Sequence, residues 1–198
     1  GVRGGSATVH FPIWHQEIED ILVLKNNKGT EDNRVRKLDY SIQITKLFYE
    51  RFIKNAEISL FSPNHVPGLY EAFGMPEFDS MYLKYEKDKS VPRQTIGAQE
   101  LFQALLKERA ETGRIYIMNL DHCNTHSSFK DKIYMSNLCQ EITLPTTPIQ
   151  HIDDKEGEIA LCILSAINLG LLTDMNELEE LCDLSVRALD EIIDYQEY

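Results

Sequence analysis

Residues 94–121 constrain the fold of this chain more than any other stretch. The segment QTIGAQELFQALLKERAET has the apolar spacing of an amphipathic helix, and Gly113 follows where a C-terminal cap belongs. The strand-like segment RIYIMNLD begins directly after this glycine. Helices that alternate with buried strands indicate the α/β class, which is the fold class predicted here.

The rest of the chain shows the same alternation. Further strands are predicted at residues 7–11, 57–63 and 158–172, and the last is a near-continuous apolar run typical of an interior strand. Further helices are predicted within residues 14–25, 34–54, 67–74 and 77–88, and a long helix is predicted after Asp174, its expected cap. Residues 121–136 are predicted to form a polar loop. No repeat or linker divides the chain, so all 198 residues are predicted to belong to one domain.

Charge and hydropathy exclude two classes of protein. The net charge is −12 and no cluster of Lys and Arg stands out, which argues against a nucleic-acid groove but not against a phosphorylated small molecule. No apolar run reaches the length of about 18 residues that a membrane span needs. The chain starts inside a glycine-rich loop without an initiator methionine, so we expect a piece of a longer protein.

The segment SNLCQEITLP carries the most reactive combination of side chains. If it is extended, Asn137, Cys139 and Glu141 share one face, because side chains alternate along a strand. An amide, a thiol and a carboxylate together could form a catalytic site, but the polar face of an ordinary strand would show the same pattern. A hydrolase with Cys139 as nucleophile would need a nearby histidine, and nothing in the spacing of the histidines supports one.

Other reactive residues carry weaker signals. The segment DHCNTH holds His122, Cys123 and His126, but zinc sites usually show a second ligand pair downstream, so we interpret it as part of a polar loop. Cys162 and Cys182 have the pattern of inert, apolar positions. The segment GVRGG allows close approach to a phosphate or a base, yet it fits neither common nucleotide-binding fingerprint.

Seven motifs, taken jointly, resemble the large catalytic subunit of class I ribonucleotide reductases. They cover nearly the whole chain and are GVRGGSAT, LVLKNNKGTEDNRVRKLDY, LFSPNHVPGLYEAF, YEKD, ERAETGRIYIMNLDHCNTHS, SNLCQEI and GEIALCILSAINLG. The resemblance implies part of a ten-stranded α/β barrel with a central finger loop that carries the reactive cysteine. Residues 1–198 would then hold the end of the specificity loop, the later part of the first half-barrel, the finger loop and the start of the second half-barrel.

The same resemblance implies roles for individual residues. Cys139 matches the cysteine that becomes a thiyl radical, Glu141 the carboxylate that accepts a proton, and Asn137 the amide that binds the sugar hydroxyls. Cys162 matches one member of the redox thiol pair. The remaining implied substrate-binding residues are Leu138 and Gln140 in the finger loop and Arg3 and Gly4 in the specificity loop.

The resemblance also implies partners. These are a ribonucleoside diphosphate substrate, a small radical-generating subunit with a metal cofactor, a thioredoxin or glutaredoxin type reductant, the missing segments of the large subunit, and a homodimer of the full subunit. We expect no metal or cofactor bound by this segment itself, nucleotide effectors bound by the full subunit, a cytoplasmic location, and no activity of the isolated chain. The alternative is a non-catalytic barrel fragment that serves as an assembly or nucleotide-binding module.

Overall fold

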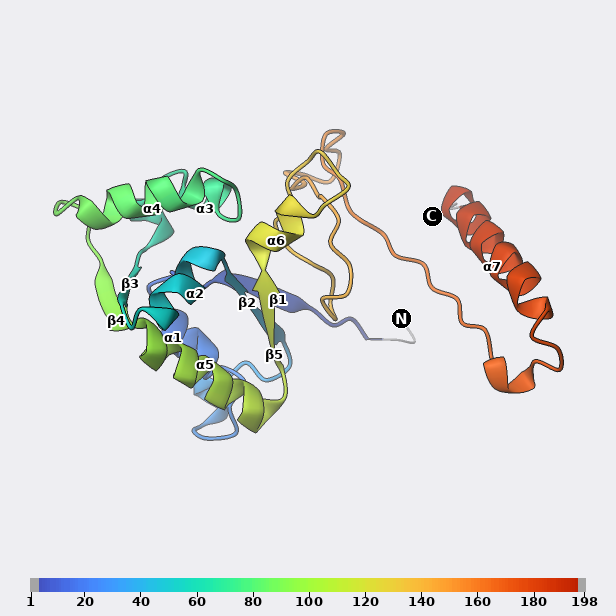
Figure 1. The fold of residues 1–198 in the computed structure, drawn as a ribbon, viewed down its shortest axis with the longest axis horizontal. Coiled ribbons are helices and arrows are strands. Elements are labelled where there is room, and N and C mark those ends of the chain that lie inside the picture. Colours follow the sequence, from blue (N-terminus) through green and yellow to red (C-terminus); the bar gives the residue numbers. More distant parts are fainter. Residues whose placement is uncertain (1–3, 196–198) are drawn as a thin grey trace. The chain divides into compact units, whose positions relative to one another are not determined.

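The computed structural model describes residues 4–195 (Figure 1). The chain divides into two units, Gly1–Thr147 and Pro148–Tyr198. The first unit contains helices and strands in alternation, which confirms the predicted α/β class. The strands of the described residues form one sheet of three strands and one of two, and they do not close into a barrel. None of the described helices has the length and apolar character needed to cross a bilayer.

The larger sheet is parallel and has the strand order β1-β2-β5. Its strands are β1 (Thr8–Pro12), β2 (Asp39–Ile44) and β5 (Ile115–Asn119). In the central strand, Tyr40, Ile42 and Ile44 alternate with Ser41 and Gln43, and all five side chains are buried. Because alternate side chains point to opposite faces, β2 has an apolar side and a side that carries Ser41 and Gln43, which we call the polar face, and both sides of this strand are closed to solvent.

Helices pack around this sheet and around each other. α1 (Ile18–Leu22) and α2 (Lys46–Ile53) contact α5 (Ala98–Thr112), which also contacts β5 (Figure 1). The smaller sheet pairs β3 (Glu57–Leu60) with β4 (Gln94–Gly97) in antiparallel fashion. α3 (Leu69–Ala72) and α4 (Phe78–Lys87) lie between these strands in the sequence. Short 3-10 helices occupy Glu31–Asn33 and Pro63–His65.

An aromatic cluster forms the centre of the first unit. Phe48, Phe73, Phe78 and Tyr82 are almost fully buried, and their ring centroids lie 4.7–6.4 Å apart at mostly tilted or edge-on angles. Such arrangements are favoured because they place positive ring edges against negative ring faces. The Tyr82 hydroxyl donates to the Ser59 carbonyl and accepts the Ser59 N–H, both at 2.8 Å, so its polar atom is satisfied inside the core.

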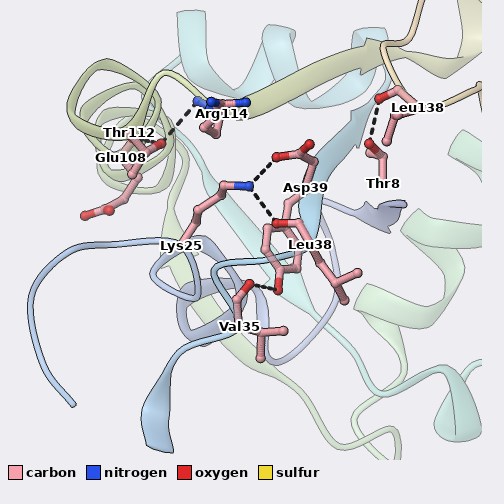
Figure 2. A network of polar contacts seen from close by, with 10 residues as sticks. Thr8, Lys25, Val35, Leu38, Asp39, Glu108, Thr112, Arg114 and Leu138 are labelled. Atoms are coloured by element: carbon pink, nitrogen blue, oxygen red, sulfur yellow. Dashed lines mark hydrogen bonds and ion pairs between the residues drawn. The ribbon is translucent and has the colours of Figure 1, made fainter. Parts of the chain in front are cut away.

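Polar contacts fix the start of the central strand. Lys25 Nζ donates to the Leu38 carbonyl at 2.8 Å and forms an ion pair with Asp39, as Figure 2 shows. The Tyr40 hydroxyl donates to the Val35 carbonyl at 2.9 Å. These contacts tie the loop after α1 to β2, so the strand begins at a defined residue.

The predicted helix over residues 34–54 is wrong. The structure places β2 in its first half and α2 in its second. Val35, Leu38 and Ile42 have helical spacing, but the alternation of Tyr40, Ile42 and Ile44 also fits a strand. Pairing with β1 and β5 decides between the two patterns, because tertiary contacts override local preference.

Two other predictions need smaller corrections. The helix expected over residues 94–112 begins only at Ala98, because Gln94–Gly97 forms β4. Its predicted cap is confirmed, since Gly113 has a φ of +65° and donates its N–H to the Arg109 carbonyl. The polar loop expected over residues 121–136 begins with a helix, α6 (Leu120–Thr125).

The second unit differs most from the prediction. Residues 158–172 are not a strand in the structure, and apart from the 3-10 helix Leu169–Leu171 they carry no helix or strand. A strand needs a neighbouring backbone for its hydrogen bonds, and the described part of this unit contains no β-strand to provide one. The long final helix is confirmed as α7 (Glu177–Asp194). Its N-cap is Asn176, whose N–H is accepted by Asp174, so the predicted cap lies two residues too early.

Gly74 and Gly113 offer a matched test of packing in the first unit. Both have positive φ, but a Cβ on Gly74 would lie 2.6 Å from Leu120 Cγ, whereas a Cβ on Gly113 would meet nothing within 4 Å. Gly113→Ala should lower the free energy of unfolding by about 1 kcal/mol, the cost of left-handed backbone. Gly74→Ala should cost a further 1–3 kcal/mol or so for overpacking against the buried Leu120. Denaturant titration of both variants measures the difference, and equal losses would contradict it.

Candidate active site

Residues 137–142 form a tight turn in which Cys139 is exposed. The Gln140 N–H donates to the Asn137 carbonyl at 3.2 Å, which places Leu138 and Cys139 at the centre of the turn. The Ile142 N–H donates to Asn137 Oδ1 at 3.0 Å, and the Asn137 N–H reaches the Ile142 carbonyl at 3.4 Å. The side chain of Asn137 therefore closes the turn that presents the thiol.

The expected extended segment is absent from residues 137–141. Gln140 has a φ of +63°, a left-handed conformation that interrupts strand-like alternation. Asn137, Cys139 and Glu141 thus do not share a face through a period of two. They follow one another through the turn instead, and Cys139 and Glu141 are both exposed.

The turn is held on the polar face of the three-stranded sheet. Thr8 Oγ1 on β1 donates to the Leu138 carbonyl at 2.6 Å (Figure 2). Ser41 Oγ on β2 donates to Gln140 Oε1 at 2.5 Å, and Gln140 Nε2 donates to the Ile117 carbonyl on β5 at 2.6 Å. The residues on both sides of Cys139 are therefore bonded to the sheet, and each of its three strands takes part.

The approach to the turn is anchored in the same manner. Gln43 Nε2 on β2 donates to the Tyr134 carbonyl at 2.5 Å. The Asn124 side chain on α6 makes two bonds with the backbone of Ile133, which is buried. These contacts fix residues 133 and 134 on the same unit that carries the turn.

A pocket of about 410 Å³ opens beside the turn at the carboxyl end of β5. Gln140 and Thr143 line one side, and Asn119 and His122 belong to the end of β5 and to α6. This volume is within the range of small-molecule sites. In open α/β sheets ligands bind beyond the carboxyl ends of strands, and the pocket lies at such an end. Of residues 137–141, however, only Gln140 lines it.

The segment with two histidines and a cysteine lies mostly on α6. The rings of His122 and His126 are 5.6 Å apart, and His126 Nδ1 lies 3.1 Å from the His122 carbonyl oxygen. Burial, and to a lesser extent the Asp121 carboxylate, raises the pKa of the Cys123 thiol. A raised pKa disfavours the thiolate that metal binding and nucleophilic attack require. Within residues 4–195, no three His, Cys, Asp or Glu side chains are grouped to hold a metal ion.

Comparison with known proteins decides the family. The family model described as "Ribonucleotide reductase, barrel domain" matches residues 1–198. The chain belongs to the ribonucleotide reductase family. The ribonucleoside-diphosphate reductase subunit alpha of Haemophilus influenzae is 59% identical over 203 residues, covering 100% of this chain and 27% of the relative. The corresponding subunit of enterobacteria phage T4 is 45% identical over 206 residues, again 100% of this chain and 27% of the relative.

A third relative agrees. The ribonucleoside-diphosphate reductase 1 subunit alpha of Escherichia coli is 57% identical over 154 residues, which are 75% of this chain and 20% of that protein. The chain thus spans about a quarter of the length of these relatives.

The structure brings together only some of the site residues predicted for a ribonucleotide reductase. Asn137, Leu138, Cys139, Gln140 and Glu141 lie in one turn. Cys162 is exposed and belongs to the second unit. Gly4 is exposed, and Arg3 lies outside the described residues.

Sequence reasoning missed Thr8, Ser41 and Gln43, whose side chains bond to the segment that carries Cys139. The alternation in DYSIQI was the available signal, since it places Ser41 and Gln43 on one face of a strand.

His10 on β1 should make the stability of this reductase domain depend on pH. Both ring nitrogens are buried without a hydrogen-bond partner in the structure, and burial lowers the pKa of His10 from 6.5, although the nearby Ser136 backbone offsets part of this. The unfolded chain then binds the proton at a higher pH than the folded one, so the free energy of unfolding falls as pH decreases below about 6.5. Denaturant titrations from pH 7.5 to 5 should show a smaller decrease for His10→Leu. Parallel curves for the two proteins would contradict this expectation.

Proposed function

We propose that this chain is part of the catalytic large subunit of a ribonucleoside-diphosphate reductase, with Cys139 as the residue that forms the thiyl radical. The observation that carries the proposal is the exposed cysteine in a turn bonded to three parallel strands, within a domain of this family. A thiol held in this way has a fixed position, so it can react with the same C–H bond of a bound sugar in every catalytic cycle.

The proposed reaction assigns a role to three of the five predicted residues of the turn. The Cys139 thiyl radical takes the 3′ hydrogen of the ribose and becomes a thiol. Glu141 accepts the proton of the 3′ hydroxyl, and Asn137 holds the sugar hydroxyls in register. The 2′ hydroxyl then takes up a proton and leaves as water.

The replacement of the 2′ hydroxyl needs two electrons and two protons. Cys162 and a second thiol from outside this chain supply them and become a disulfide. Glu141 finally returns its proton to the 3′ oxygen, and the hydrogen on Cys139 returns to the 3′ carbon, which restores the thiyl radical. A reductant of the thioredoxin or glutaredoxin type would reopen the disulfide by thiol exchange, and the exposure of Cys162 suits such an exchange.

The proposal extends to the architecture and partners of the full subunit. The three parallel strands would be part of a ten-stranded α/β barrel, with residues 133–147 as its finger loop and the 198 residues as one segment of that domain. Arg3 and Gly4 would belong to the loop that reads the substrate base. The full subunit would be a cytoplasmic homodimer that binds nucleotide effectors and receives its radical from the metal cofactor of a small subunit. The isolated chain would be inactive.

The test is a turnover assay of the subunit assembled from this chain and the remaining large-subunit segments. The assay contains the radical-generating subunit, a dithiol reductant and a ribonucleoside diphosphate, and it measures the deoxyribonucleotide formed. Formation of product that is lost in Cys139→Ser supports the proposal. An assembled subunit without turnover, or with turnover that survives this substitution, would overturn it.

A further inference from the structure

We propose that Gln140 is a positioning residue for Cys139, whose side chain sets the location of the sulfur by joining the turn to two strands. The inference rests on the proposed function, because positioning matters only where Cys139 reacts. Gln140 Oε1 accepts a hydrogen bond from Ser41 Oγ on β2, and Gln140 Nε2 donates to the Ile117 carbonyl on β5. One carboxamide thus bridges neighbouring strands next to the reactive residue.

The orientation of this carboxamide is determined by its partners. A backbone carbonyl only accepts, so the amide nitrogen must face Ile117 and the amide oxygen must face the Ser41 hydroxyl. Ser41 is fully buried and lies in the pairing register of β2 with β5, opposite Tyr116 and one residue before the Ile42–Ile117 pair. One anchor point is therefore a backbone carbonyl of the paired strands, and the other is the hydroxyl of a short, buried side chain on the neighbouring strand.

The backbone of Gln140 gives an independent reason for this tether. A φ of +63° is disfavoured for residues with a Cβ, and glutamine lacks the short side chain that lets asparagine stabilise this conformation locally. Such a conformation persists where the surrounding structure holds it. Here the two hydrogen bonds of the carboxamide stabilise the left-handed backbone of Gln140, and with it the turn that exposes Cys139.

The other side of the cysteine is held in a complementary way. Thr8 Oγ1 on β1 donates to the Leu138 carbonyl at 2.6 Å. Hydrogen transfer requires the reacting atoms to lie about 3–3.5 Å apart, and small displacements cost much of the rate. Loss of the Gln140 anchor should therefore reduce the rate of the chemical step more than the affinity for substrate.

The test compares two glutamine substitutions in the assembled subunit. Gln140→Met keeps the length of the side chain and removes both hydrogen bonds, whereas Gln103→Met changes an exposed glutamine on α5. We expect Gln140→Met to lower kcat about tenfold or more and to change KM less than about twofold. Gln103→Met should match the wild type. Ser41→Ala should lower kcat less than Gln140→Met and add little to it in the double variant, because both remove the same tether.

A second measurement does not depend on turnover. Hydrogen exchange at the amides of residues 140 and 142, which close the turn, should be faster in Gln140→Met than in Gln103→Met. A raised KM with unchanged kcat would indicate direct substrate contact and would overturn the inference. Exchange and kcat equal to those of the control would also overturn it. If turnover does not depend on Cys139 at all, the proposed function fails, and the inference fails with it.

Discussion

Cys139→Ser should abolish deoxyribonucleotide formation by the assembled subunit. Serine has nearly the same size, but its O–H bond is much stronger than an S–H bond, so the oxygen radical needed for the same step is out of reach. The rest of the structure should be unaffected, because Cys139 is exposed and the turn is closed by the backbone and side chains of its neighbours. We therefore expect no product while the free energy of unfolding changes by less than about 0.5 kcal/mol.

The matched control for this substitution is Cys182→Ser. Cys182 is also exposed, but it lies on α7 in the second unit. This variant should retain wild-type turnover, which separates the loss of one particular thiol from the general effect of removing a sulfur atom. Turnover that persists in Cys139→Ser, or that disappears equally in both variants, would remove the basis for assigning the chemistry to the turn.

Glu141→Gln should lower kcat by about 10²–10⁴-fold, the range typical for the loss of a general base. Glutamine has almost the same shape as glutamate and still binds hydroxyl groups, but it cannot accept the proton of the 3′ hydroxyl. KM should change little, because the substrate contacts are largely kept. Steady-state kinetics of the assembled subunit measure both constants, and a kcat within threefold or so of the wild type would exclude Glu141 as the base.

Glu19→Gln provides the control for this second substitution. Glu19 is exposed on α1. Its substitution by glutamine removes one negative charge, as Glu141→Gln does, at a position remote in sequence from the turn. Its kcat should equal that of the wild type. A similar decrease in both variants would mean that net charge, rather than the proton-accepting group at position 141, governs the rate.

Local patterns in the sequence predicted the elements that depend on near neighbours. The helix that ends at Gly113 and the strand that follows it are both present, because a left-handed glycine cap and an apolar strand are encoded within a few residues. α4 and β3 were also predicted, because each is encoded by a short, continuous stretch of sequence. In residues 34–54 the apolar residues fit both the helical period and the strand alternation, so the local pattern could not decide between helix and strand.

The elements that depend on distant partners were the ones that the sequence could not determine. Residues 158–172 have the composition of an interior strand, yet strand formation needs a neighbouring backbone, which composition does not provide. The tether of the turn joins Thr8 to Leu138 and Ser41 to Gln140, pairs that are 130 and 99 residues apart. The left-handed Gln140 was equally unpredictable, since glycine and asparagine are the residues that signal this conformation.

The polar face of the sheet has a consequence for how the protein matures. Residues 134–140 bond to the buried Ser41 Oγ and Gln43 Nε2, whereas Gln43 Oε1 is buried without a partner in the described part of the chain. A lost hydrogen bond to a buried polar group is costly. A molecule that leaves this loop undocked lacks these hydrogen bonds and the packing of the loop on the sheet, so it is less stable. Correct placement of Cys139 is thus coupled to completion of the fold. Molecules with a misplaced thiol are less stable, and we expect proteases to degrade them faster than correctly folded molecules.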